Sequence, residues 1–439
     1  MEWTLAIIAL TLIAFGTVSR RLDGTPLTSA IIFVGVGLVV GAQALDLLDP
    51  SPTGEPVKAL AEATLTLVLF ADASRIDMRT LRREYAVPAR LLGIGLPLTI
   101  AFGALLAAAL FGALSVPEAL VLAVLLAPTD AALGQAVVTE PRLPSRIRQG
   151  LNVESGLNDG ICVPLLFIVL AVAEADAGEV SAAHAARLVV EEIGFGIVGG
   201  VAAGAVAAAA IRFGGSRGLI ERSWVQIVPV AGAALAFGIA TPLGGSGFIA
   251  AFVAGMTFGV LRRPSEEGEL TLLMDELGEG LNAVTLVVFG AVLLWPALDG
   301  LTWQIVLYAV ASLTVIRMVP VAVAMLGTGA RRPTVGFLGW FGPRGLASIV
   351  FAVIVVQEAD LPHTTTIVLT TYATVGLSVL LHGLTAAPLA RRYASWFASH
   401  PRDAMPTMES VPAGAHRWRR PSAGDDDTLG TAGEGVGTR

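Results

Sequence analysis

Cysteine and lysine are almost absent from the sequence. Cys162 is the only cysteine, and it lies within an apolar run. A lone cysteine excludes an internal disulfide and a cysteine-based metal cluster, so we expect neither redox chemistry nor a cofactor. Lys58 is the only lysine among 28 basic residues, and 35 acidic residues give a formal net charge of -7. This balance argues against a nucleic-acid partner.

Charge of either sign is scarce, and apolar residues take its place. Only 14% of the residues are charged whereas 54% are hydrophobic, and the mean hydropathy is +0.74, which excludes a soluble enzyme. Apolar runs of about 20 residues, enough to cross a hydrocarbon core of ~30 Å, recur along the chain. The first run lacks a basic flank and a small-residue cleavage site, which favours a permanent helix over a signal peptide. We predict an all-α polytopic membrane protein with thirteen transmembrane helices, which begin near Trp3, Pro26, Pro56, Ala86, Val116, Ile147, Ala186, Trp224, Leu243, Leu270, Thr302, Pro333 and Thr364.

Arginines mark one side of the membrane. They follow the odd-numbered spans, as Arg20 and Arg21 follow span one, whereas the intervening loops are short or acidic. The positive-inside rule then places the N-terminus outside and the C-terminus in the cytoplasm, and we expect a location in the cell membrane. Residues 396–439 are polar and rich in Gly, Pro and Asp, which predicts a disordered cytoplasmic tail.

Glycines at four-residue spacing allow helices to approach closely. Gly196, Gly200 and Gly204 form one such series, and Gly37 with Gly41 forms another. Packing within the chain is a more frequent use of this spacing than a dimer seam, so we favour internal packing.

Five ionisable residues lie inside the predicted spans, where each charge costs ~2.5–3.5 kcal/mol and usually faces the bundle interior or a water-filled route. At the rise of an α-helix, Asp130 and Asp159 lie roughly 20 Å into spans five and six, close to the midplane. Two such carboxylates would offer hard oxygen ligands, which suit a small monovalent cation. The five residues are Asp130, Glu154, Asp159, Arg317 and Arg344.

Two of these charges fall where a helix is expected to break. Proline lacks an amide donor, so the stretches Ala127-Pro128-Thr129-Asp130 and Gly342-Pro343-Arg344-Gly345 interrupt spans five and twelve. These spans run in opposite directions, which predicts inverted repeats with two broken helices that cross at a binding site. Asp130 would then face a helix N-terminus, and Arg344 would face carbonyl ends. The structural alternatives are that Asp130 only caps a kink and that Arg344 only satisfies freed carbonyl groups.

Span six and Arg317 raise questions of pairing. Ser155 and Asp159 share one face of a helix, with Asn158 on the adjacent face. Asn158 could contact an ion, but an interhelical hydrogen bond is the favoured interpretation. Arg317 stays charged and needs a carboxylate partner, for which Glu154 is the best candidate and Asp159 the rival.

Taken together, these motifs resemble the monovalent cation/proton antiporters, in the branch of the NhaP-type sodium/proton antiporters and the eukaryotic sodium/proton exchangers. The resemblance covers residues 1–395 and rests on four motifs in order: Ala127-Pro128-Thr129-Asp130, Glu154-Ser155-Gly156-Leu157-Asn158-Asp159, Ile316-Arg317 and Gly342-Pro343-Arg344-Gly345. It implies that Asp130 and Asp159 bind the ion with help from the Thr129 carbonyl group and Ser155. It also implies that Glu154 pairs with Arg317. The Asn158-Asp159 pair is similar to that of the electroneutral branch.

The same resemblance implies an architecture. It predicts a homodimer with an NhaA/NhaP-like antiporter fold, in which an interface domain is separate from a core that holds the site. One motif departs from the family, because Asp72 stands near a position where relatives often carry glutamate. Asp72 either joins the ion site or pairs with Arg75 at the interface. The expected division is 1–85 (interface), 86–175 (core), 176–300 (linker helix and interface), 301–395 (core) and 396–439 (tail).

The expected function is therefore exchange of Na+, with Li+ as a further substrate, for H+ in a 1:1 electroneutral cycle that serves pH homeostasis. K+/H+ exchange is the nearest alternative, because nothing in the residue types decides the ion. A membrane-embedded hydrolase would need a nucleophile with a base or a metal. We instead expect all five histidines to fall in loops or near span ends, and no zinc-binding spacing is present. A passive cation channel is the third class and would conduct current.

Overall fold

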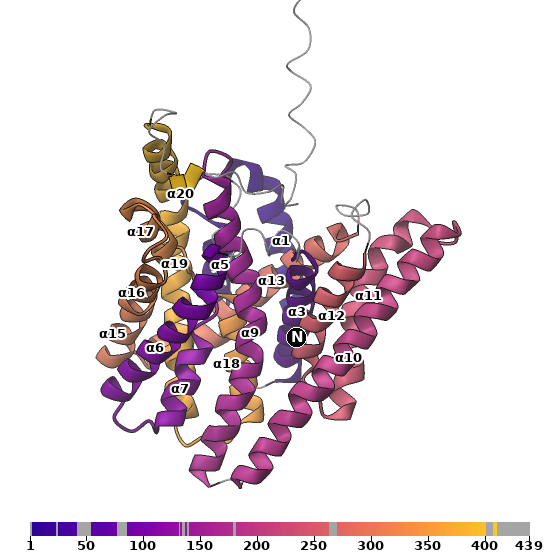
Figure 1. The fold of residues 1–439 in the computed structure, drawn as a ribbon. Helices are drawn as coiled ribbons and strands as arrows, with labels where there is room; N and C mark the ends of the chain where they lie inside the picture. The colour runs from indigo at the N-terminus through magenta and orange to yellow at the C-terminus, as the bar shows by residue number, and fades with distance from the viewer. Residues whose placement is uncertain are drawn as a thin grey trace, which may run out of the picture.

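The computed structural model is helical throughout the part of the chain that it describes (Figure 1). Those residues are 2–22, 25–41, 54–76, 86–130, 132–133, 137, 140–178, 181–262, 270–400 and 407–410. Each of the thirteen predicted spans corresponds to one helix or to consecutive helices. The first six spans are α1 (Glu2–Leu22), α2 (Ser29–Val40), α3 (Glu55–Ser74), α5 (Ala86–Arg90) with η1 (Leu91–Gly95) and α6 (Leu96–Leu110), α7 (Val116–Leu125), and α9 (Ser145–Ala177).

The later spans follow the same pattern. Spans seven to nine are α10 (Ala182–Ser216), α11 (Arg222–Ala240) with η2 (Thr241–Leu243), and α12 (Gly247–Leu261). Span ten joins α13 (Leu272–Val288), η4 (Phe289–Leu293) and α14 (Leu294–Asp299), and span eleven joins α15 (Trp303–Leu313) and α16 (Val315–Ala324). Span twelve is divided into α17 (Arg332–Trp340) and α18 (Leu346–Glu358), and span thirteen is α19 (Thr364–Ala398).

Helix length separates the continuous spans from the interrupted ones. Seven helical stretches among the described residues are long and apolar enough to cross a membrane by themselves. Four more, α2, α7, α12 and α18, are apolar but have only 12, 10, 15 and 13 residues. The shortness of α7 and α18 follows from the two predicted breaks, because each ends or begins at a Pro-containing stretch in the middle of its span.

The helices pack into two groups with α9 between them. α3, α10, α11 and α12 contact one another, and α15, α16 and α6 form part of a second group with α7 and α19. α9 contacts α3, α10 and α12 on one side and α7 and α18 on the other, so the predicted site lies where the groups meet (Figure 1).

The glycine series serve packing inside the chain, as predicted from their spacing. A methyl group at Gly200 would meet the Ala250 carbonyl oxygen of α12 at 2.5 Å, and Gly204 is equally close to the Ala254 carbonyl group. Gly37 and Gly41 pack in the same way against α13 and η4. Only glycine lets these backbones come so near.

Two expectations need correction. His382 lies in the middle of α19 and is fully buried, and both ring nitrogens have hydrogen-bond partners. The histidines are therefore not confined to loops and span ends. The predicted tail is also not uniformly without structure. α19 continues to Ala398, and α20 (Thr407–Ser410) docks through the buried Glu409. Residues 401–406 and 411–439, with His416, lie outside the described residues.

Candidate functional site

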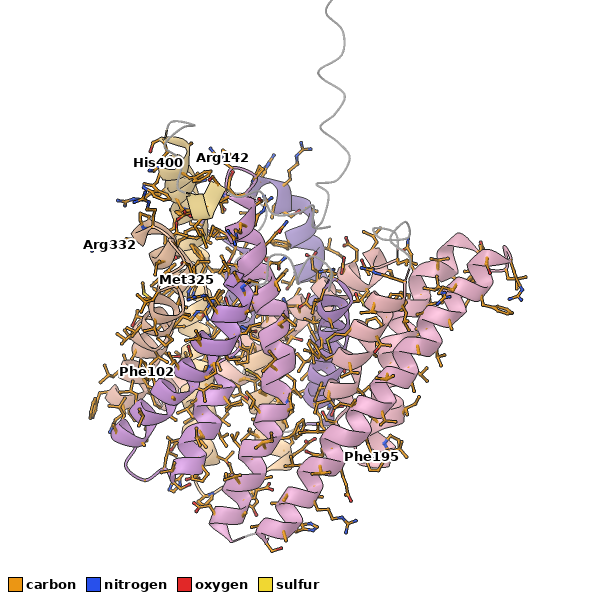
Figure 2. All side chains as sticks on the ribbon, viewed as in Figure 1. Phe102, Arg142, Phe195, Met325, Arg332 and His400 are labelled. Carbon is orange, nitrogen blue, oxygen red and sulfur yellow. The ribbon has the colours of Figure 1, made fainter. Side chains whose placement is uncertain are left out.

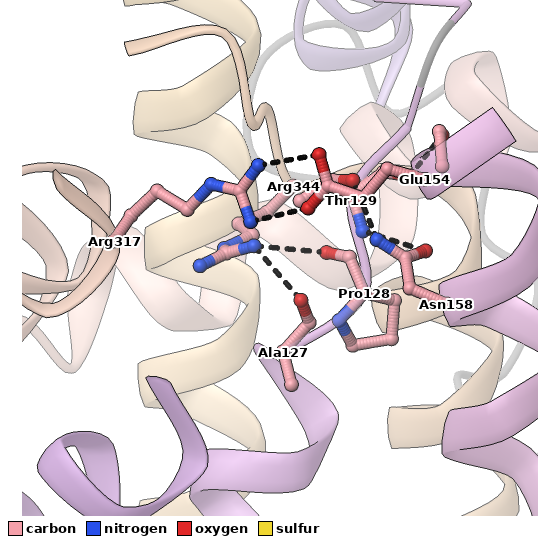
Figure 3. Close-up of polar contacts among 8 residues, drawn as sticks. Ala127, Pro128, Thr129, Glu154, Asn158, Arg317 and Arg344 are labelled. Carbon is pink, nitrogen blue, oxygen red and sulfur yellow. Dashed lines mark hydrogen bonds and ion pairs between the residues drawn. The ribbon is translucent and has the colours of Figure 1, made fainter. Parts of the chain in front are cut away.

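The interruptions of spans five and twelve meet and bind each other through backbone groups, while most of the second half of span five (131, 134–136 and 138–139) lies outside the described residues. The Asp130 amide donates to the Pro343 carbonyl oxygen at 2.8 Å, which joins one interruption directly to the other. Arg344 is fully buried, and its Nη1 atom donates to the carbonyl oxygens of Ala127 (3.0 Å) and Pro128 (3.2 Å), as Figure 3 shows. The predicted crossing is therefore present. Arg344 faces the carbonyl end of α7, where a positive charge is favourable.

The Asp130 carboxylate faces the start of α18. Its Oδ2 atom accepts a hydrogen bond from the Leu346 amide at 3.1 Å, and its Oδ1 atom accepts one from the Ala132 amide at 2.8 Å. Asp130 thus meets a helix N-terminus, and it also has the capping role that stood as its structural alternative. Gly345 makes this approach possible, because a methyl group there would collide with the Asp130 carboxylate.

Arg317 pairs with Glu154 rather than with Asp159. The Nη1–Oε1 distance is 2.6 Å and the Nη2–Oε2 distance is 2.8 Å, so the contact is bidentate (Figure 3). Both side chains are 2% exposed, which makes this a buried ion pair. Arg317 neutralises the negative charge of Glu154 in this pair, so Arg317 does not neutralise Asp159.

Asn158 and Ser155 on α9 hold the interrupted stretch of span five. The Asn158 Nδ2 atom donates to the Thr129 hydroxyl at 2.6 Å, and its Oδ1 atom accepts from the Thr129 amide at 3.3 Å. The Ser155 hydroxyl donates to the Thr129 carbonyl oxygen. The interhelical hydrogen bond is therefore present for Asn158, whose amide group is engaged at both ends. Together these bonds fix Thr129 one residue before Asp130.

Asp159 differs from the carboxylates of Asp130 and Glu154 because one of its oxygens has no hydrogen-bond partner among the described residues. The residue is 8% exposed, and its Oδ1 atom is buried without a hydrogen bond to any part of the chain that the structure describes. Asp130 and Asp72 are both near enough to act on it electrostatically. Asp72, Asp130 and Asp159 are therefore close enough for their charges to interact.

The Asp72 side chain lies between α9 and Arg75. Asp72 packs on Gly156 of α9, where an added methyl group would lie 3.3 Å from the Asp72 Cβ atom. Its charge reaches Asp130 as well as Asp159. The Arg75 Nη1 atom is 3.7 Å from Asp72 Oδ1, and Arg75 also contacts Asp275. Asp72 thus lies near Arg75, as one alternative expected, and its charge also acts on Asp159, as the other alternative requires.

A supporting network on α19 was not predicted. The Ser378 hydroxyl accepts a hydrogen bond from the Arg344 amide at 2.7 Å and lies 3.2 Å from His382 Nδ1. The His382 Nε2 atom donates to the Trp340 carbonyl oxygen at 2.9 Å. This chain of contacts ties the end of α17 and the interruption after it to α19. The only signal in the sequence was a histidine inside an apolar run.

Crossed broken helices with buried charges at the crossing are typical of secondary transporters with inverted repeats. The family model described as "Sodium/hydrogen exchanger, transmembrane" matches residues 6–392. Because this match covers most of the chain, the protein belongs to the sodium/hydrogen exchanger family.

Comparisons with individual proteins agree with this membership. A probable Na+/H+ antiporter of Schizosaccharomyces pombe is 27% identical over 368 residues, which are 77% of this chain and 46% of that protein. This chain thus matches less than half of that relative's length. The K+/H+ antiporter NhaP2 of Shewanella sp. (strain MR-4) is 24% identical over 394 residues, which are 88% of this chain and 66% of that protein.

A solved structure confirms the predicted antiporter fold. The sodium proton antiporter MjNhaP1 from Methanocaldococcus jannaschii at pH 8 matches with a TM-score of 0.74 and 19% sequence identity. The match covers 90% of this chain and 99% of that one.

Proposed function

We propose that this protein exchanges Na+ for H+ across the membrane and that Asp159, assisted by Asp130, holds either ion. The observation that carries this proposal is the buried Oδ1 atom of Asp159, which accepts no hydrogen bond from the described residues. A buried carboxylate oxygen without a partner is costly unless a proton or a cation neutralises it. In a family of sodium/hydrogen exchangers, ion exchange is the natural use of such an oxygen.

Competition for one site couples the two fluxes. The charges of Asp72, Asp130 and Asp159 interact, so the empty anionic cluster is costly and one bound proton or cation relieves the repulsion. An entering cation therefore displaces the proton. Because moving the empty cluster through the membrane would be expensive, only loaded states cross, and exchange is obligatory.

The same contacts support one proton per cation. Glu154 is bound to Arg317 at both oxygens, and the amide of Asn158 does not titrate. Asp130 keeps two backbone donors, so Asp159 is the carboxylate that changes partner in the cycle. Thr129 and Ser155 stand beside it, and Asp72 adds negative charge to the cluster. The cycle needs no cofactor and no covalent chemistry.

The expected setting is the cell membrane, with the N-terminus outside and the C-terminus in the cytoplasm. We propose a homodimer in which residues 1–85 and 176–300 form the interface domain, while 86–175 and 301–395 form the core. In cells the proton gradient would drive Na+ out and H+ in, which serves pH homeostasis.

Reconstituted protein tests the proposal directly. After a Na+ pulse outside proteoliposomes, we expect the lumenal pH to rise as protons leave, without a sustained current. Asp159→Asn should abolish this response. Asp299→Asn is the matched control, because Asp299 is an exposed aspartate at the end of α14, away from the cluster. Exchange at the normal rate in Asp159→Asn, or a steady current, would refute the assignment.

K+/H+ exchange is the second candidate, because the relatives named as K+/H+ antiporters match 88% of this chain. The same vesicles decide between the ions when the pulse is K+ or Li+ at equal ionic strength. A response to K+ that equals or exceeds the response to Na+ would move the assignment to K+.

A further inference from the structure

A cavity of about 350 Å³ lies at the end of the molecule that carries the arginine-rich loops. It is partly open, and its lining residues come from the starts of α5 and α9, the turn after α16, and α20. Arg142, Arg332 and His400 lie toward the same end (Figure 2). None of its lining residues belongs to the crossing of α7 and α18. Its lining residues are Ala86, Val87, Arg90, Arg146, Gly327, Thr328 and Met408.

Two arginines, Arg90 and Arg146, line this cavity. Arg146 donates through Nη1 to the Met408 carbonyl oxygen at 3.3 Å, and its Nε atom is buried with no hydrogen-bond partner. Arg90 donates through Nη1 to the carbonyl oxygens of Ala324 (3.0 Å) and Leu326 (2.7 Å). Among the residues that the structure describes, neither arginine forms an ion pair.

These features select a class of ligand. Guanidinium groups bind phosphate through paired N–H donors, and a buried unpaired N–H gains a full hydrogen bond when such an anion arrives. The cavity volume is at the lower end of the ~300–1,000 Å³ usual for small-molecule sites. Val87 and Met408 add apolar surface beside the charges, which would suit the carbon atoms next to a phosphate group. Basic pockets between transmembrane helices at the cytoplasmic side are sites for lipid headgroups.

We propose that this cavity binds a phosphate-bearing anion, supplied by a lipid headgroup of the adjoining leaflet or by soluble phosphate. The anion would accept hydrogen bonds from Arg146 and Arg90. It would thereby link α5 and α9 of the first half of the chain to the turn after α16 in the second half. It would also hold α20 in place, because Met408 forms one wall. This site is separate from the proposed exchange site and does not depend on which cation is carried.

Thermal unfolding of the full chain in nanodiscs tests the proposal and separates the two sources. One arm compares phosphatidylcholine discs with discs that also contain phosphatidylglycerol. The other adds inorganic phosphate to phosphatidylcholine discs, with chloride at equal ionic strength as its reference. Ligand that binds only the folded state should raise the Tm by roughly 2–5 °C. A rise in the first arm alone identifies lipid, and a rise in the second identifies soluble phosphate.

Two variants make the result specific to the cavity. Arg146→Gln should lose at least half of the rise, and Arg146→Lys should keep part of it because the charge remains. Arg142→Gln is the control, since Arg142 is an exposed arginine at the same end that binds Glu140 instead. The proposal is overturned if neither arm raises the Tm. It is equally overturned if Arg146→Gln and Arg142→Gln reduce the rise by the same amount, because the effect would then be general attraction to an anionic surface.

Discussion

Asp130 and Asp159 carry the same side chain but differ in what their oxygens contact. Asp130 accepts hydrogen bonds from two backbone amides, whereas Asp159 Oδ1 accepts none from the described residues. We expect Asp159→Asn to abolish exchange while keeping or raising the Tm. Asp130→Asn should impair exchange and also lower stability by about 1–3 kcal/mol, because an amide nitrogen cannot accept one of the two bonds. Proteoliposome flux and thermal unfolding, measured on both variants, check this. A larger loss of Tm in Asp159→Asn would contradict it.

The ion pair of Arg317 and Glu154 makes a separate prediction at the same scale. Arg317→Met strands a buried carboxylate and should cost about 3–5 kcal/mol. Adding Glu154→Gln to that variant removes the stranded charge and should recover much of the Tm. If the two residues only neutralise each other and stabilise the core, the double variant should also regain measurable exchange. A double variant that is as stable as the wild type yet inactive would show that Glu154 or Arg317 takes part in ion binding.

At the scale of helices, the contact of α10 with α12 depends on missing side chains. Gly200→Ala places a methyl group 2.5 Å from the Ala250 carbonyl oxygen, so we expect a loss of about 1–3 kcal/mol in stability. Gly194→Ala on the same helix meets nothing within 4 Å and should be neutral or stabilise by about 0.5–1 kcal/mol. Thermal unfolding of the two variants compares them directly. Equal Tm values would show that the helices can separate at little cost.

The docking of α20 on α17 is another contact between elements. The Glu409 Oε1 atom accepts hydrogen bonds from the Arg331 amide (2.9 Å) and the Thr334 hydroxyl (2.5 Å), so it caps the start of α17 from far along the chain. Glu409→Ala should cost about 1 kcal/mol, as the loss of a helix cap does. Amide hydrogen exchange in the first turn of α17 should become faster, while Ser410→Ala, a change at the exposed neighbour, should leave it unchanged. Unaltered exchange in Glu409→Ala would contradict the capping role.

For the whole molecule, the sequence predicted the fold far better than it predicted the site. Each apolar run became a helical span because a backbone in hydrocarbon must satisfy its own hydrogen bonds. The crossing was predictable for a related reason. Pro128 and Pro343 interrupt spans five and twelve, and the cost of charge at that depth required partners for Asp130 and Arg344.

The sequence could not predict in which direction a side chain points or how close two helices lie. The sequence left two alternatives for Asp72, and only the packing of α3 on α9 places its side chain against Gly156. Ser378 and His382 support Arg344 through contacts that leave no periodic trace in the sequence. The docking of Glu409 was missed because a polar tail appears unable to fold by composition alone, although a single carboxylate can fasten it to a helix start.

Orientation in the membrane is the property of the whole molecule that most needs a measurement. α10 has 35 residues and is therefore roughly 50 Å long, so its ends must emerge on opposite sides of the bilayer. Arg212 and Arg217 stand at its second end, which predicts that this end faces the cytoplasm. In intact cells, a membrane-impermeant maleimide should therefore label Ser181→Cys but not Ser216→Cys, which should react only after lysis. The natural Cys162 is fully buried and should stay silent, so the unmodified chain is the control. Labelling of Ser216→Cys from outside would reverse the topology, and with it the side on which α20 and the arginine-lined cavity lie.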